Sequence, residues 1–347
     1  MRCGSQELSP FFSAKSLVHW DRIKKIAEGE IPYPVSAEID PSNLCNHRCE
    51  WCMFKAFKQK HPDSLSEELM ISLIKELKDV GVKAITFTGG GEPLMNSSTR
   101  TVMLYCKSLG IECGLVTNGG LIDKFSKTIG ECCRFVRISL DAGSPETHKA
   151  VHNPASGLNY QEILEEMKSL KNAYPGLVVG ASFLVCNKNY SEVYKASENV
   201  MKTGADYIQI RPVIQGITLS QANVAQAQIF KAKKKLESEN FKVYGIMHRF
   251  SEVIDMEKRF TKCRATPLIT NIGADGNVYI CCQLRGNPKF IIGNIKEKSF
   301  REIWSSKKHK NVINSINIEK CPVCRYIPYN ELIEKIAVKD DVHRNFL

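Results

Sequence analysis

From residue 35 to about residue 240 the sequence alternates short apolar runs with helical patterns, and this alternation restricts the fold more than any other feature. Six runs rich in β-branched and aromatic residues predict strands at Val35–Ile39, Ala84–Thr88, Glu112–Thr117, Phe135–Leu140, Leu177–Cys186 and Asp206–Pro212. Amphipathic patterns predict helices at Ser66–Val80, Thr99–Leu109, Asn159–Ala173, Tyr190–Thr203 and Ser220–Glu239. Strands that are joined by crossover helices run parallel in one sheet. The nearly all-apolar strands indicate that both faces of this sheet are covered.

The pattern changes after residue 248. Two β-rich runs, Leu268–Gly273 and Asn277–Cys282, flank Ala274-Asp275-Gly276, which is typical of a hairpin. An amphipathic stretch at Phe300–Ile316 and a short polar tail follow. We therefore expect an α/β chain with an N-terminal extension (1–34), a parallel sheet domain (35–248) and a smaller C-terminal domain (249–347).

Composition excludes several classes of protein. The 347 residues carry a formal net charge of +11, and the densest basic runs, Lys231–Lys235 and Lys307–Lys310, lie in predicted helices, so no nucleic-acid partner is expected. No signal peptide is visible, and the longest apolar run has ten residues, whereas a membrane-spanning helix needs about 20. We expect a cytoplasmic protein. Because cytosolic thiols stay reduced, its 14 cysteines indicate metal binding or catalysis rather than disulfides.

The strongest local signal is Cys45-Asn-His-Arg-Cys49-Glu-Trp-Cys52. Three closely spaced thiols can converge on one metal site. A [4Fe–4S] cluster normally has four cysteine ligands, so three would leave one iron open, as in catalytic sites. Zinc is the alternative, since ligand softness alone does not separate zinc from iron–sulfur.

This C-x3-C-x-aromatic-C pattern, placed directly after the first strand, resembles the signature of the radical S-adenosylmethionine (radical SAM) superfamily. The resemblance implies that Cys45, Cys49 and Cys52 hold three irons and that the fourth binds SAM. An electron from the reduced cluster would then cleave SAM to methionine and a 5′-deoxyadenosyl radical. It also implies that Trp51 lies against the adenine, that His47 is not a ligand, and that the fold is a partial (β/α)6 TIM-like barrel.

Polar residues follow successive predicted strands, at the edge where β/α barrels build active sites. Gly89, Gly90 and Gly91 would allow close backbone approach, and Glu92 offers a carboxylate for an ammonium group. By the resemblance, this loop grips the SAM amino group, while Asn118, Ser139 and Asp141 face SAM. Arg211, at the end of the sixth strand, suits a carboxylate of either SAM or the substrate.

A second cysteine set lies beyond residue 260. The spacing Cys263-x12-Gly276-x4-Cys281, followed by Gly293-Asn-Ile, Glu302-Ile-Trp and Cys321-x2-Cys324, resembles the SPASM/twitch extension of this superfamily. The resemblance implies one auxiliary [4Fe–4S] cluster held by Cys263, Cys281, Cys321 and Cys324, closed and suited to electron transfer. A structural zinc ribbon is the alternative. Cys282 could replace Cys281 as a ligand, or act catalytically as a hydrogen-atom donor. The remaining cysteines fit no ligand spacing and are expected to be buried: Cys3, Cys106, Cys113, Cys132, Cys133 and Cys186.

The implied activity is hydrogen abstraction from a substrate by the deoxyadenosyl radical. We favour a small polar substrate, such as an aminosugar, cyclitol or sugar nucleotide, that is oxidised or epimerised, with flavodoxin or ferredoxin as electron donor. Peptide modification is the main alternative: the 44 residues before Cys45 are too few for a leader-binding module, although a leader could bind elsewhere or through a partner. A zinc-binding interaction protein is a remote alternative. His148 and His152, in the expected loop after the fourth strand, could meet a substrate, but loop histidines are more often solvated and we expect that here.

Overall fold

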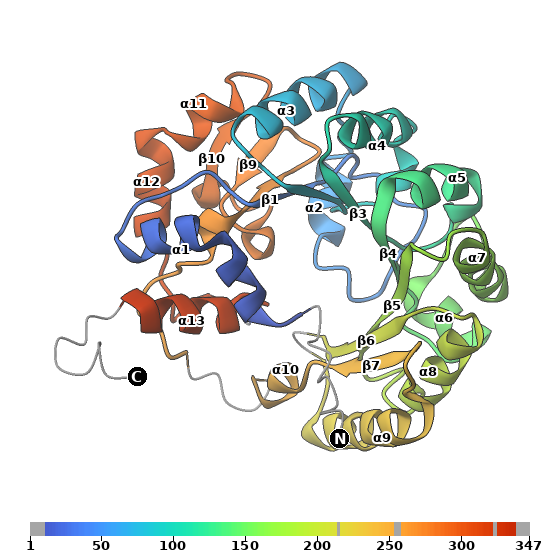
Figure 1. The fold of residues 1–347 in the computed structure, drawn as a ribbon. Helices are drawn as coiled ribbons and strands as arrows, with labels where there is room; N and C mark the ends of the chain where they lie inside the picture. The colour runs from blue at the N-terminus through green and yellow to red at the C-terminus, as the bar shows by residue number, and fades with distance from the viewer. Residues whose placement is uncertain (1–10, 214–215, 253–257, 322–324, 338–347) are drawn as a thin grey trace, which may run out of the picture.

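A computed structural model describes residues 11–213, 216–252, 258–321 and 325–337. Its ten strands form one sheet in the order β10-β9-β8-β1-β2-β3-β4-β5-β6-β7 (Figure 1). Strands β1 to β7 pair in parallel with their neighbours, β8 is parallel to β1, and β9 and β10 complete an antiparallel end. The strands are β1 Ser36–Ile39, β2 Ala84–Phe87, β3 Glu112–Thr117, β4 Cys133–Ser139, β5 Val178–Val185, β6 Tyr207–Pro212, β7 Lys242–Gly245, β8 Ile269–Ile272, β9 Asn277–Tyr279 and β10 Ile291–Asn294.

Helices cover the convex side of the curved sheet, as Figure 1 shows for α3, α4, α5, α7, α8 and α9. Ser66 caps α3, and capping boxes at Asn159 and Thr218 begin α7 and α9, so local sequence fixes these starts. The helices are α1 Trp20–Ala27, α2 Lys55–Lys60, α3 Glu67–Asp79, α4 Thr99–Ser108, α5 Ile122–Cys132, α6 Pro145–His152, α7 Tyr160–Ala173, α8 Val193–Lys202, α9 Leu219–Leu236, α10 Met247–Glu252, α11 Phe300–Trp304, α12 Lys307–Asn314 and α13 Ile327–Ala337.

The predicted α/β class, the six parallel strands and the hairpin are confirmed, and the sheet with its outer helices is a partial TIM-like barrel. Several elements were not predicted, among them β7, α5 and α6. Strand β7 has only four residues, and α5 begins without a side-chain cap. Helix α6 has few apolar residues, but its Ser144 cap and Pro145 were a usable start signal.

The C-terminal hairpin is part of the barrel sheet. Strand β8 pairs with β1 from Ser36↔Ile269 to Ile39↔Ile272, so β1 lies between β2 and β8. Helix α10 also spans the expected division between residues 248 and 249. The division into domains therefore stays a prediction from sequence.

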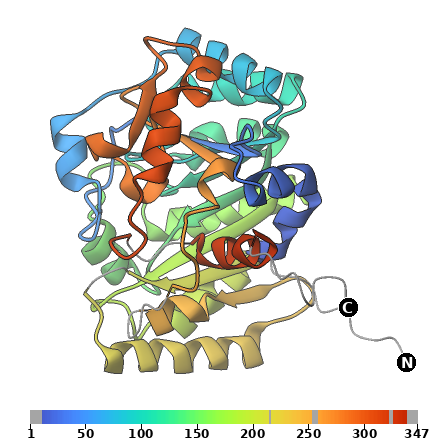
Figure 2. The ribbon, with the colours of Figure 1, turned by 90° about the vertical axis from the view of Figure 1, so that its left-hand side faces the viewer.

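The prediction of a polar tail after the last cysteine motif is wrong for its first part. Residues 327–337 form α13, whose Ile333 is fully buried against Ile23 and Ile26 of α1 and against Leu268. Figure 2 shows the two terminal segments side by side. The apolar stripe of α13 was missed because the segment is short and mixed with charged residues.

Five cysteines outside the two motifs are buried and free, as predicted: Cys106, Cys113, Cys132, Cys133 and Cys186. Cys3 lies outside the described residues. Among the residues that the structure describes, no helix combines the length and apolar character needed to cross a membrane.

Candidate functional site

The loop after β1 brings three thiols into one short segment. Cys45, Cys49 and Cys52 are half-buried and free, and the loop turns back so that the Cys52 N–H donates to the Cys49 carbonyl over 3.4 Å. Burial raises the pKa of Cys45 to about 11, and nearby Cys49 adds to the shift. A metal would displace these protons, so the donor set fits a soft metal or an iron–sulfur cluster.

The glycine loop after β2 packs directly on this cysteine loop. Gly91 N–H donates to Ser42 O over 3.1 Å, and Glu92 N–H donates to Leu44 O over 2.8 Å. A Cβ at Gly91 would lie 2.1 Å from Leu44 O, so only glycine fits there. Glycine was expected here for close approach to a ligand; at Gly91 the neighbour is protein backbone.

Glu92 connects this loop to the end of β3. Its buried carboxylate accepts from Thr117 Oγ1 (2.6 Å), from Asn118 N (2.8 Å) and from Leu94 N (3.2 Å). Burial raises the pKa of Glu92 to about 7. The carboxylate that was predicted for an ammonium group thus has protein donors of its own.

Asn118 then links β3 to the cysteine loop. Its Nδ2 donates to Asn46 Oδ1 over 2.8 Å and lies 3.8 Å from Cys45 Sγ. The side-chain oxygen of Asn118 accepts from Gly120 N over 2.8 Å. The polar residues at the ends of β2 and β3 therefore meet the cysteine loop, as parallel strand ends should.

Asp141, after β4, holds a buried histidine. Its backbone is left-handed (φ 50°), its Oδ1 accepts from Leu184 N over 2.7 Å, and its Oδ2 forms an ion pair with His152 Nε2 at 3.1 Å. Asp141 and His152 are each only 2% exposed. Burial opposes the charge of His152, but Asp141 and Cys49 raise the pKa of this imidazole to about 10.

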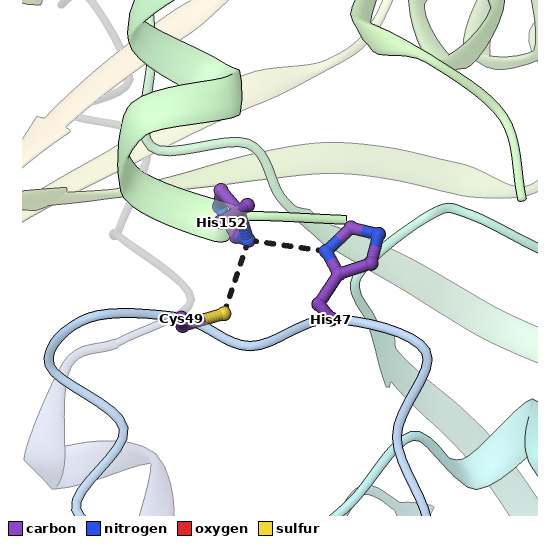
Figure 3. Close-up of side chains that lie close together, drawn as sticks. All are labelled: His47, Cys49 and His152. Carbon is purple, nitrogen blue, oxygen red and sulfur yellow. Dashed lines mark hydrogen bonds between the residues drawn. The ribbon is translucent and has the colours of Figure 1, made fainter. Parts of the chain in front are cut away.

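Figure 3 shows the other side of the His152 ring. His152 Nδ1 lies 3.3 Å from Cys49 Sγ and 3.4 Å from His47 Nδ1. The prediction that His148 and His152 are solvated loop residues is wrong: both lie in α6, are 2% exposed and stack at 4.7 Å. No apolar periodicity in this segment indicated their burial.

His47, Cys49 and His152 form a second group of donors. Their ligand atoms lie within 4.8 Å of one another. Burial and the neighbouring His152 lower the pKa of His47 to about 3, so its ring is neutral. Cys49 belongs to both donor groups, and its sulfur therefore joins them.

The other residues predicted to face SAM surround this region. Trp51 is half-buried, with its ring edge-on to His152 at 6.4 Å. Ser139 ends β4 beside Ser182. Arg211 Nε on β6 is buried without a hydrogen-bond partner among the described residues. Burial, together with the nearby arginines Arg137, Arg249 and Arg325, lowers the pKa of Arg211 to about 9.

Three cysteines of the second set line one small apolar cavity. Cys263, Cys281 and Cys321 surround it, with Ile269, Ile280, Leu284, Ile316 and Tyr326 among the other lining residues. Several thiols in an apolar pocket fit a cluster or a soft metal ion. Cys282 is not among the residues that line it, and its Sγ lies 3.6 Å from Arg325 Nη2. Cys324 lies outside the described residues.

Two ion pairs that the sequence did not indicate join this region to β1 and the residue that follows it. Arg325, which is partly exposed, pairs with Glu38, and in a buried pair Arg285 Nε lies 2.9 Å from Asp40 Oδ2. Burial raises the pKa of Asp40 to about 7, although Arg285 opposes the shift. Partners so distant in sequence leave no local pattern.

Comparisons with known families agree with this geometry. Residues 39–199 match the family model described as the radical SAM superfamily. Residues 263–325 match the SPASM model, described as an iron–sulfur cluster-binding domain. The two matches include every predicted metal ligand.

Curated relatives and solved structures carry several names. An AdoMet-dependent heme synthase of Oleidesulfovibrio alaskensis is 25% identical over 293 residues, covering 76% of this chain and 73% of that protein. The sporulation killing factor maturation protein SkfB of Bacillus subtilis is 28% identical over 284 residues, covering 78% of this chain and 65% of that protein. The crystal structure of Streptococcus suis SuiB bound to precursor peptide SuiA has a TM-score of 0.67 at 16% identity, covering 87% of this chain and 72% of that chain. At that identity the likeness shows the fold alone.

Proposed function

Because the chain belongs to the radical SAM superfamily and carries a C-terminal SPASM domain, we propose that it abstracts a hydrogen atom from its substrate. We propose further that this substrate is small and polar and that the reaction is an oxidation or an epimerisation. Its cofactors are SAM and [4Fe–4S] clusters, which together supply the electron transfer and the 5′-deoxyadenosyl radical of this superfamily. The family matches leave no support for the alternative of a zinc-binding interaction protein.

We assign the SAM-binding cluster to Cys45, Cys49 and Cys52. The observation that carries this assignment is the docking of two strand ends on the cysteine loop, through Glu92 N to Leu44 O and through Asn118 to Asn46. This contact supports SAM binding beside the three thiols. The residues proposed to contact SAM are Trp51, Gly89, Gly90, Gly91, Glu92, Asn118, Ser139, Asp141 and Arg211.

We assign a single auxiliary cluster to Cys263, Cys281, Cys321 and Cys324. The shared cavity of the first three supports this set and favours Cys281 over Cys282 as ligand. Cys282 instead lies beside Arg325, which pairs with Glu38 on β1. We propose Cys282 as the hydrogen-atom donor if the reaction is an epimerisation.

The arginine at the end of β6 favours an anionic substrate among the small polar candidates. Burial lowers the pKa of Arg211, and nearby Arg137, Arg249 and Arg325 lower it further, whereas Asp141 raises it. Arg325 is itself paired with Glu38, but Arg211 Nε is buried with no hydrogen-bond partner among the described residues. A buried cationic group is costly unless an anion joins it. A carboxylate or phosphate would provide that balance, which favours a sugar nucleotide over an uncharged cyclitol.

Peptide modification is the second candidate. It is favoured by the 28% identity to SkfB, whose name describes a maturation protein. Arg211 suits a peptide carboxylate as well as a phosphate. The two candidates therefore differ in substrate size rather than in the charge that the site accepts.

Iron analysis and a substrate screen test the proposal. The chain is purified and reconstituted without oxygen, and iron and sulfide are counted. About eight of each per chain are expected for two [4Fe–4S] clusters. Formation of 5′-deoxyadenosine is then measured with dithionite, SAM and two panels, one of sugar nucleotides and aminosugars and one of synthetic peptides. Stimulation by peptides alone would replace the first candidate with the second, and zinc without iron would overturn both.

A further inference from the structure

A buried acid–histidine pair ends at one of the three thiols of the cysteine loop. Asp141 Oδ2 lies 3.1 Å from His152 Nε2. On the other side of the ring, His152 Nδ1 lies 3.3 Å from Cys49 Sγ, a contact that is marked by a dashed line in Figure 3. The three residues come from the end of β4, the end of α6 and the loop after β1. This contact is separate from the residues assigned to SAM, except for Asp141.

The position of Asp141 determines what His152 can offer to Cys49. Asp141 Oδ2 faces Nε2 at ion-pair distance but without hydrogen-bond geometry, and Cys49 Sγ faces Nδ1. Asp141 is itself held by Leu184 N at 2.7 Å, and its carbonyl accepts from Asn189 Nδ2 at 2.8 Å. Once Cys49 ligates the cluster as a thiolate, the ring lies between two anionic groups, which favours a proton on each nitrogen and makes Nδ1 the donor to the sulfur.

Two acceptors compete for the Nδ1 proton. His47 Nδ1 lies 3.4 Å away, slightly farther than Cys49 Sγ at 3.3 Å. A thiolate that ligates iron carries negative charge, and hydrogen bonds to charged acceptors are the stronger ones. The sulfur is therefore the preferred acceptor once the cluster is in place.

We propose that His152, oriented by Asp141, donates a hydrogen bond to the Cys49 sulfur of the SAM-binding cluster and raises the reduction potential of that cluster. This inference rests on the proposed function, because it takes Cys49 as a cluster ligand. Hydrogen bonds to the sulfurs and the local net charge are the main means by which a protein sets such potentials. His152 is thus a positioning and tuning residue, with no direct contact to substrate.

A matched set of variants separates the hydrogen bond from the charge. His152→Leu removes both, whereas the amide of His152→Asn can still donate from near the Nδ1 position without the charge. Asp141→Asn leaves the ring and removes its anchor. His309→Gln is the control, since His309 is a buried histidine of α12 that bonds to Trp304 O at 2.7 Å.

The readout is a redox titration of reconstituted protein followed by electron paramagnetic resonance. The SAM-binding cluster is recognised by the change of its signal when SAM is added. In His152→Leu, the ratio of reduced to oxidised SAM-binding cluster at a fixed potential should fall at least tenfold, equal to 59 mV for a one-electron couple. This ratio should fall less in His152→Asn and in Asp141→Asn, and in His309→Gln it should equal that of the wild type. The ratio for the auxiliary cluster should not change in any variant.

Unchanged ratios in a loaded His152→Leu protein would overturn the inference and leave the proposed function intact. If that variant does not hold its cluster, His152→Asn and Asp141→Asn decide by the same measure. If the wild-type chain itself has no SAM-sensitive cluster, the proposed function fails first, and iron analysis alone reveals it.

Discussion

Replacing Gly91 with alanine should force the glycine loop away from the cysteine loop. The new Cβ would lie 2.1 Å from Leu44 O and 2.5 Å from the carbonyl carbon of Asn43. Ordinary van der Waals contact begins at 3.4 Å, so the backbones must separate by about 3.4 − 2.1 = 1.3 Å. Both neighbours are backbone atoms, and a rotamer change cannot relieve the clash.

The energetic cost follows from this displacement. Overpacking a filled site costs about 1–3 kcal/mol. The movement also breaks the hydrogen bonds from Gly91 N to Ser42 O and from Glu92 N to Leu44 O, each worth about 1 kcal/mol. We expect the free energy of unfolding of Gly91→Ala to fall by about 3–5 kcal/mol. Iron content should fall too, because Leu44 directly precedes Cys45.

Anaerobic urea unfolding followed by circular dichroism measures the first effect, and iron per chain measures the second. Gly176→Ala is the matched control, since a Cβ there meets nothing within 4 Å. Surface substitutions of this kind usually stay within about 0.5 kcal/mol. A Gly91→Ala protein that is as stable as the control and fully loaded with iron would refute the packing of these two loops.

Three further predictions concern other parts of the site. Cys321→Ala should lose about four of eight iron atoms per chain while the SAM-sensitive signal remains, and full iron content would argue against Cys321 as a ligand. Glu92 has a folded-state pKa raised by burial to about 7, so its contribution to stability is present below the unfolded value near pH 4.5 and is lost as pH rises to 7. In urea unfolding, the free energy of unfolding of the wild type should fall by up to about 3 kcal/mol between pH 4.5 and 7, and that of Glu92→Gln should depend less steeply on pH. In the wild type, the backbone N–H groups of Arg264 and Ala265 donate to Asn330 Oδ1 at 2.6 and 2.9 Å, and Asn330→Ala leaves both without this acceptor. We expect the free energy of unfolding to fall by about 2 kcal/mol and iron retention at neighbouring Cys263 to weaken. Lys335→Gln, at an exposed position, should have neither effect.

Local patterns in the sequence predicted six of the parallel strands and the hairpin, and they singled out both cysteine sets. The order of strands in a parallel sheet brings their carboxyl ends to one edge, so Glu92, Asn118 and Asp141 were correctly expected at the same edge as Cys45. The hydrogen-bond and ion-pair partners of these residues could not be predicted from the sequence. Glu92 bonds to Thr117 and Asn118, and Asp141 holds His152, contacts that no periodicity encodes.

The contacts that the sequence did not reveal join residues distant along the chain. Arg325 pairs with Glu38 across 287 positions, and Cys49 meets His152 across 103. Glycine was recognised as a loop former, but its neighbour could not be identified before the two loops were placed together. Such features follow from tertiary packing, whereas strands and helix starts follow from neighbouring residues.

The pairing of β8 with β1 limits how this chain can be divided or recombined. Strand β1 leads straight into the cysteine loop, and its second edge is covered only by a strand that arrives more than 200 residues later. A fragment that ends near residue 248 would leave this edge bare and prone to intermolecular pairing. The two iron–sulfur regions therefore cannot be exchanged independently between relatives. A transferred C-terminal region would have to include a hairpin whose strand pairs in register with the first strand of the recipient.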